Sequence, residues 1–159
     1  MAINHKQEFV FTKRDPFFPY LRGMETATTV YTGGLRTKAT HIRSGMEIIT
    51  DAPTDNHGKG EAFSPTDLMA TSLGLCMSTV MGIKAEEHDL DLNGMTQKVT
   101  KVMGSNPRRV TEVIIEFDMP DREYSDKEKA MLEQTAINCP VAKSLHPDLK
   151  QTITFNYKR

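Results

Sequence analysis

The clearest hydrophobic pattern in the chain lies in residues 64–88. Apolar residues recur there at spacings of three and four, which is typical of one face of an α-helix. This face contains Met69, Leu73, Cys76, Val80 and Ile83. Because Leu68, Leu75 and Met77 widen the apolar surface, we expect a helix that is buried on most sides. Polar residues return from residue 84 onward, where the helix should emerge.

The start of this helix is marked by its capping residues. Ser64 is a favourable N-cap, Pro65 suits the first helical position, and Asp67 completes an S-x-x-D capping box. The sequence therefore predicts that the helix begins at residue 64 or 65.

Residues 26–52 predict three short β-strands joined by tight turns. Residues 26–32 are rich in β-branched and aromatic side chains, residues 35–42 alternate between two faces, and residues 46–50 form a third strand. Gly33-Gly34 and Ser44-Gly45 supply the turns. A polar loop, DAPTDNHGKGE, follows at residues 51–61, and loops of this kind often lie beside active sites.

The second half of the chain predicts two strands, two helices and a closing strand. Strand patterns at 95–104 and 108–120 flank a turn, and Val113, Ile115 and Phe117 alternate as in a half-buried strand. Ser125 caps a helix over residues 125–138, a short helix follows at 140–147, and the last strand spans 152–157. This order of elements predicts an α+β fold with an antiparallel sheet.

Residues 1–25 differ from the domain that we expect over residues 26–159. They hold five of the eleven aromatic residues: Phe9, Phe11, Phe17, Phe18 and Tyr20. A flexible terminal extension is one interpretation. Aromatic side chains are poor material for a solvated tail, so we favour an arm that docks on a surface, such as that of a partner subunit.

Composition and charge exclude several classes of protein. With 20 Lys and Arg against 21 Asp and Glu, the net charge is -1, so no basic surface for nucleic acid or an anionic membrane is expected. The hydrophobic content of 38% is too high for a disordered chain. No apolar run is expected to reach the ~20 residues of a membrane span. The N-terminus lacks a signal-peptide pattern, so we expect a cytoplasmic protein whose thiols are reduced.

The chain has two cysteines, Cys76 and Cys139, which leaves metal ligands, inert core residues or a redox pair as interpretations. A metal site is disfavoured because neither cysteines nor histidines show ligand spacing. Cys76 lies inside an apolar helix. Considered by itself, it is most simply interpreted as a buried core residue. Cys139 precedes Pro140 at a helix start, where free backbone N–H groups stabilise a thiolate and lower its pKa. A helix-terminus cysteine without a role is the alternative for Cys139.

Three blocks of sequence carry a family resemblance. They are VYTGGLRTKATHIRSG at residues 30–45, DAPTDNHGKGEAFSPTDLMATSLGLCMSTVMGIKAEE at 51–87 and INCPVAKSLHPD at 137–148. The most specific features are a helical cysteine after S-P-x-[DE]-L and a later C-P-V-[AS]-K-S-L. Together these blocks resemble the OsmC/Ohr family, the osmotically inducible and organic-hydroperoxide-resistance proteins.

The resemblance implies a fold and an activity. The implied fold is an intertwined homodimer in which long central helices lie between β-sheets, with active sites at the subunit interface. The implied activity is a thiol-dependent peroxidase acting on organic hydroperoxides and, as a further possibility, on hydrogen peroxide. Cys76 matches the peroxidatic position, which becomes a sulfenic acid, and Cys139 matches the resolving position, which then forms a Cys76–Cys139 disulfide. An external dithiol reductant and no bound cofactor are implied.

The resemblance also implies an arginine near the peroxidatic cysteine, oriented by a carboxylate. Arg36 in GGLR matches this arginine best, and Arg43 is a second candidate. The family's usual glutamate, ten residues before the peroxidatic cysteine, is Thr66 here. Asp67 already has a capping role, so the carboxylate is either missing or replaced, with Glu61 as the candidate. This departure indicates a divergent OsmC-like subgroup.

The sequence also predicts an apolar substrate pocket and leaves two other classes of function open. The four residues predicted to line an apolar substrate pocket are Phe63, Met69, Leu73 and Met77, and the alternative for them is core packing. The Thr66 departure favours a second class of function, an OsmC-like dimer that binds a small apolar or thiol ligand without turnover. A redox sensor, whose disulfide alters partner binding, is a third.

Overall fold

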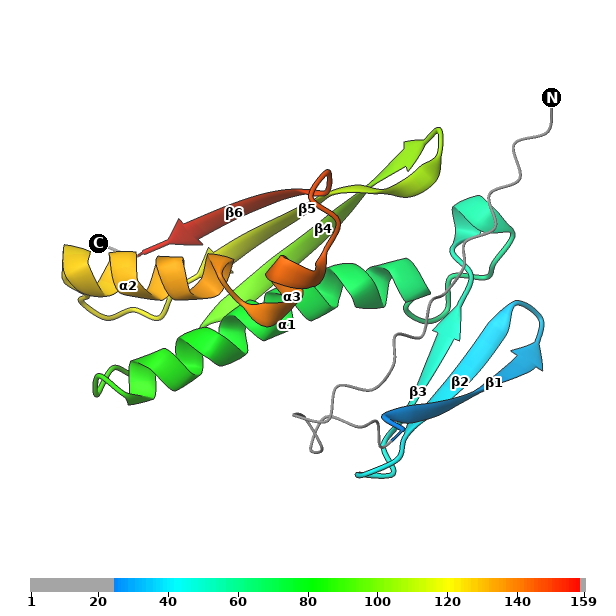
Figure 1. The fold of residues 1–159 in the computed structure, drawn as a ribbon, viewed down its shortest axis with the longest axis horizontal. Coiled ribbons are helices and arrows are strands. Elements are labelled where there is room, and N and C mark those ends of the chain that lie inside the picture. Colours follow the sequence, from blue (N-terminus) through cyan, green and yellow to red (C-terminus); the bar gives the residue numbers. More distant parts are fainter. Residues whose placement is uncertain (1–24, 158–159) are drawn as a thin grey trace, which may run out of the picture.

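The computed structural model describes residues 25–157, and their elements form two three-stranded sheets and three α-helices (Figure 1). The arm predicted over residues 1–25 lies outside the described residues apart from Glu25. The mixed helix and strand content confirms the α+β class.

The first sheet is the predicted meander. Its strands are β1 (Ala27–Gly33), β2 (Arg36–His41) and β3 (Glu47–Asp51), all antiparallel, in the order β1-β2-β3. Gly33 and Gly34 both have positive φ at the β1–β2 turn, which explains why glycines occupy it. A turn of 3-10 helix, Thr54–Asn56, follows β3.

The second sheet contains β4 (Thr96–Ser105), β5 (Arg108–Asp118) and β6 (Lys150–Asn156). β4 and β5 are antiparallel, as predicted, but β6 pairs with β5 in parallel. The parallel pairing corrects the expectation of a wholly antiparallel sheet. It arises because the connection between β5 and β6 contains the helices α2 (Asp126–Ile137) and α3 (Pro140–Ser144), which return the chain to the start of β5.

Helix α1 (Pro65–Glu86) lies along the second sheet and supplies the centre of the core (Figure 1). Leu73, Met77 and Met81 have no exposed surface, and neither do Val113 and Phe117 of β5. The buried face of α1 is rotated from the predicted one, because Ile83 is 55% exposed. The buried positions of α1 are Ala70, Leu73, Gly74, Met77, Met81 and Ala85.

Gly74 explains how closely α1 approaches the sheet. A Cβ atom at this position would collide with the Gln97 side chain and would crowd Val99, both on β4. The glycine therefore lets the helix axis lie nearer to β4 than any other residue would allow.

Several large apolar side chains stay exposed in the single chain. On the first sheet and the loop after it they include Val30, Tyr31, Ile48, Ile49 and Phe63, and on α1 they are Leu75 and Ile83. By the strand register, Val30 and Ile49 share one face of the first sheet, and Tyr31 and Ile48 share the other. Exposed apolar surface can mark an interaction site. The first sheet also makes little contact with α1 and the second sheet.

The expectation that no apolar segment reaches the length of a membrane span was wrong. α1, with 22 residues, is long and apolar enough to cross a membrane by length and composition. Core helices of soluble proteins meet the same criterion, and α1 packs one face against β4, β5 and α2.

We expect Leu132→Ala to lower the free energy of unfolding by about 2–5 kcal/mol, because it removes a fully buried side chain where α2 packs on the core. Ile137→Ala, on the same helix at a position that is 40% exposed, should cost less than half as much. Urea denaturation of both variants measures the difference. Equal losses would contradict this description of the core.

Candidate functional site

The first part of the site is an arginine held by two carboxylates. Arg36 begins β2 and Asp51 ends β3, and the two residues face each other in the strand register. Arg36 Nη2 donates to Asp51 Oδ2 at 3.2 Å and also forms an ion pair with the Glu61 carboxylate. The structure thus brings Arg36 and Glu61 together, as the sequence predicted, and adds Asp51, which the sequence analysis missed.

Asp51 is the buried member of this cluster. Its side chain has no exposed surface, whereas that of Glu61 is 59% exposed. The same Oδ2 atom also accepts the backbone N–H of Glu61 at 3.1 Å. The signal that could have identified Asp51 is its position directly after the apolar third strand, opposite the predicted start of the second.

The charges in the cluster stabilise one another. The backbone N–H of Glu61 is the largest influence on Asp51, and together with Arg36 it outweighs burial and lowers the pKa of the Asp51 carboxyl. The Glu61 and Asp51 carboxylates in turn raise the pKa of Arg36 above its usual value. Asp51 is therefore an anion at neutral pH, and the Arg36 guanidinium remains a cation.

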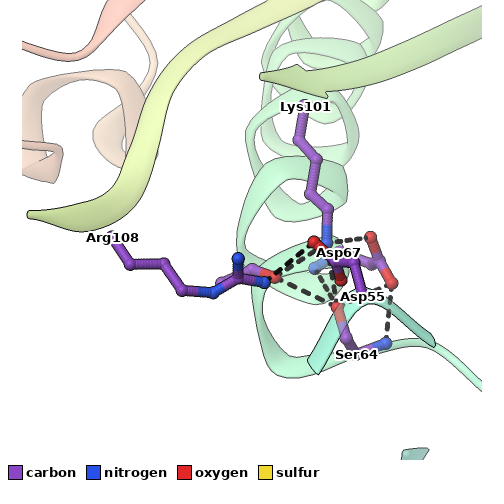
Figure 2. Close-up of polar contacts among 6 residues, drawn as sticks. Asp55, Ser64, Asp67, Lys101 and Arg108 are labelled. Atoms are coloured by element: carbon purple, nitrogen blue, oxygen red, sulfur yellow. Dashed lines mark hydrogen bonds and ion pairs between the residues drawn. The ribbon is translucent and has the colours of Figure 1, made fainter. Parts of the chain in front are cut away.

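A second polar cluster surrounds the N-terminus of α1 (Figure 2). Lys101 of β4 donates to Ser64 Oγ at 3.0 Å and to Thr66 Oγ1 at 2.8 Å, and its Nζ lies 2.7 Å from Asp67 Oδ1. Asp67 also accepts hydrogen bonds from the Ser64 backbone N–H and hydroxyl, which confirms the predicted capping box. Burial acts to raise the pKa of Asp67, but Lys101 and Ser64 outweigh it, so the pKa is lowered.

This second cluster bears on which carboxylate holds the arginine. Both Thr66 and Asp67 bond to Lys101, whereas the side-chain bonds of Arg36 among residues 25–157 go to Asp51 and Glu61. Arg43, the second arginine candidate, lies in the exposed turn between β2 and β3. A further ion pair, Arg108 with Asp55 at 3.0 Å, lies beside the helix start (Figure 2).

The second part of the site is a pair of thiols. Cys76 lies in the middle of α1 and is half-buried, and Cys139 is the N-cap of α3 and is 1% exposed. Both are free thiols, and they are close enough for Cys76 to affect the ionisation of Cys139. The structure therefore brings together two cysteines that are 63 positions apart in the sequence.

The ionisation of Cys139 differs from the prediction. The backbone N–H of Ala142 does donate to its Sγ at 3.4 Å, as expected at a helix start. Burial is the larger effect, however, and with the neighbouring Cys76 it raises the pKa of the Cys139 thiol. Cys139 is thus a protonated thiol at neutral pH, which corrects the expectation of a thiolate stabilised by the helix.

The arginine cluster and the thiols are separate within one chain. Cys76 lies 11 residues beyond Pro65, which is about 16 Å along the helix axis. In Figure 1 the first sheet lies beyond the N-terminal end of α1, while α3, whose N-cap is Cys139, lies against the middle of the helix. Among the described residues, no hydrogen bond or ion pair joins Arg36 to either cysteine.

A groove of about 580 Å³ runs between the arginine cluster and α1. Its walls include Glu61, Phe63, Asp67, Ala70 and Lys101.

The four residues predicted to line a substrate pocket divide between this groove and the core. Phe63 lines the groove, and Met69 packs against the core. Leu73 and Met77 belong to the core and have no exposed surface, so their packing role is the one that the structure assigns.

Comparisons with known proteins place the chain among related structures. The family model described as OsmC-like protein matches residues 58–154. A crystal structure of a candidate osmotic stress induced and detoxification response protein from Psychrobacter arcticus is 53% identical, covers 86% of this chain and 99% of that chain, and has a TM-score of 0.82. No match was found among curated protein sequences.

More distant structures share the fold. The OsmC-like protein from Mycoplasma pneumoniae is 17% identical with a TM-score of 0.71, and covers 87% of this chain and 100% of that chain. An organic hydroperoxide resistance protein from Elizabethkingia anophelis is 15% identical with a TM-score of 0.68, with the same coverage.

We expect Lys101→Met to lower the free energy of unfolding by about 1–3 kcal/mol at pH 7, because it leaves the capping carboxylate of Asp67 without its cation. The pKa of Asp67 is lowered by folding, so this stabilisation is present above the ordinary pKa of an aspartate and is lost as pH falls through the lowered value. The stabilities of wild type and variant should therefore converge on acidification. Denaturation curves recorded between pH 7 and pH 3 measure this difference in the free energy of unfolding.

Lys98→Met is the matched control, because Lys98 lies on the same strand and its side chain is 74% exposed. Its effect should stay within about 0.5 kcal/mol at every pH. An equal loss in both variants would contradict the assigned role of Lys101.

Proposed function

Because the chain belongs to the OsmC-like family, we propose that it is a thiol-dependent peroxidase that reduces organic hydroperoxides and also accepts hydrogen peroxide. The observation that carries the proposal is the pairing of a half-buried Cys76 with a buried Cys139, two free thiols from distant parts of the sequence. Related structures named organic hydroperoxide resistance proteins support the same activity.

The first step of the proposed reaction takes place at Cys76. Its thiolate attacks the terminal oxygen of the hydroperoxide, so an S–O bond forms and the O–O bond breaks. The terminal OH stays on the sulfur, so Cys76 becomes a sulfenic acid. The alkoxide takes up the proton that was released when the Cys76 thiol ionised and leaves as the alcohol. Cys76 is the more accessible of the two sulfurs, and Cys139 is held as a protonated thiol that competes poorly for the peroxide.

The second step forms a disulfide. The sulfur of Cys139 attacks the sulfenic sulfur of Cys76, the S–S bond forms, the S–O bond breaks and water leaves. Part of the raised pKa of Cys139 comes from its Cys76 neighbour, so conversion of the thiolate to a neutral sulfenic acid removes that charge and favours ionisation of Cys139. A dithiol reductant then returns both cysteines to thiols and is itself oxidised to a disulfide.

In this proposal, the cation that stabilises the Cys76 thiolate is Arg36 from a second copy of the chain. Arg36 is far from Cys76 along its own chain, and the first sheet and α1 expose apolar residues such as Ile49, Phe63 and Leu75. A homodimer that covers these surfaces would bring the arginine and its Glu61 partner to the partner's thiols. Each active site would then draw on both subunits.

A second candidate function is binding of a small thiol or apolar ligand without turnover. One observation favours it: a distant neighbour, a hydroperoxide resistance protein from Vibrio cholerae, has the thiol compound captopril bound in one of its active sites. Consumption of cumene hydroperoxide by the purified protein with dithiothreitol separates the two functions, because a ligand-binding protein would show no turnover above the Cys76→Ser variant.

We expect Cys76→Ser to abolish peroxide consumption and Cys139→Ser to leave at most slow cycling with Cys76 overoxidised, because the sulfenic acid then has no resolving thiol. Intact-mass measurement after one equivalent of hydroperoxide should show the loss of two hydrogens in wild type and a gain of oxygen in Cys139→Ser. A gain of one oxygen in wild type would contradict resolution by Cys139.

We expect a mixed dimer of Arg36→Ala and Cys76→Ser subunits to regain about half of the wild-type activity, since one of its two shared sites contains both intact residues. The mixed dimer is isolated with two different affinity tags, and the two single-variant homodimers are the inactive controls. An inactive mixed dimer would show that each site lies within one chain.

A further inference from the structure

We propose that Asp51 is a positioning residue of the active site: its buried carboxylate fixes the Arg36 guanidinium and the Glu61 loop in one arrangement. The inference rests on the proposed function, in which Arg36 supports the thiolate of Cys76. Asp51 acts through Arg36 and does not itself touch the peroxide or the sulfur.

A single oxygen atom of Asp51 accepts from two segments of the chain. Asp51 Oδ2 accepts from Arg36 Nη2 at 3.2 Å and from the backbone N–H of Glu61 at 3.1 Å. One atom therefore joins the start of β2 to the loop that follows β3, and its negative charge strengthens both contacts. Loss of that charge would loosen the arginine and the loop together.

The carboxylates of Asp51 and Glu61 differ in burial. The Glu61 side chain is 59% exposed, so water screens its ion pair with Arg36. The Asp51 side chain has no exposed surface and is fixed by the strand register opposite Arg36. Asp51 is thus the buried support of Arg36. Glu61 is an exposed partner whose backbone N–H also bonds to Asp51.

The acidic and polar residues at the start of α1 have partners other than Arg36. Thr66 and Asp67 both bond to Lys101, and Asp67 also holds the cap of α1. Neither side chain bonds to Arg36. The structure therefore assigns the orientation of the arginine to the end of β3 rather than to α1.

The test measures how readily Cys76 ionises. In a Cys139→Ser background Cys76 is the only cysteine, so its alkylation by iodoacetamide as a function of pH reports its thiolate. Asp51→Asn should slow alkylation at pH 7 by about tenfold. Arg36→Ala should slow it at least as much. Glu61→Gln should have a smaller effect, below about threefold.

The double variant distinguishes positioning from a merely structural role. If Asp51 acts through Arg36, Arg36→Ala with Asp51→Asn alkylates at the same rate as Arg36→Ala alone. Glu47→Gln is the matched control, because Glu47 pairs with Lys38 in the same sheet and should leave the alkylation profile unchanged. Should Asp51→Asn fail to fold, Asp51→Glu retains the charge on a longer side chain and should give an intermediate loss.

The outcomes separate the two proposals. An unchanged profile in Arg36→Ala would overturn the role of the arginine in the proposed function. A shifted profile in Arg36→Ala but not in Asp51→Asn would overturn the role of Asp51 alone. A double variant slower than Arg36→Ala would show that Asp51 acts independently of the arginine, which also overturns the inference.

Discussion

The arrangement of this protein depends on how α1 is buried. The helix packs Leu73, Met77 and Met81 against the second sheet, and Gly74 lets it lie close to β4. Once that face is fixed, Cys76 lies beside α3, and the start of the helix lies beside Lys101. The opposite face, with Leu75 and Ile83, is left without cover in the single chain. A core built on one side of its central helix thus determines where the thiols meet and which apolar helix face stays exposed.

Local sequence patterns were sufficient for most of the fold. The capping box at Ser64, the N-cap at Ser125 and the paired glycines at residues 33–34 are signals read from neighbouring residues, and the structure has all of them. The parallel pairing of β6 and the rotation of the buried face of α1 were not predicted. Both depend on how distant segments pack, since hydrophobic spacing specifies that a face is apolar but not which part of it meets the sheet.

In the candidate site, too, features that depend on neighbouring residues were predicted, and features that depend on the packing of distant segments were not. The family resemblance pointed to Arg36 and the two cysteines, and charge and position pointed to Glu61. Asp51 was missed because its importance comes from burial and from the register with Arg36, neither of which is visible in a polar loop sequence. The pKa of Cys139 was predicted in the wrong direction for a related reason. The helix start is a local feature and was identified, whereas the burial that outweighs it is a property of the packed α1–α3 contact.

The contact between α1 and α3 has a consequence for the heat resistance of the protein. A bond between Cys76 and Cys139 would close a loop that contains β4, β5 and α2, and cross-links over loops of this length remove about 4 kcal/mol of chain entropy from the unfolded state in the loop-closure description. In the oxidised chain a disulfide would link α1 to the start of α3, and in the reduced chain this link would be absent. Exposure to peroxide would then raise the melting temperature of the protein until a reductant cleaves the disulfide. The melting temperature would therefore differ between the oxidised and the reduced protein.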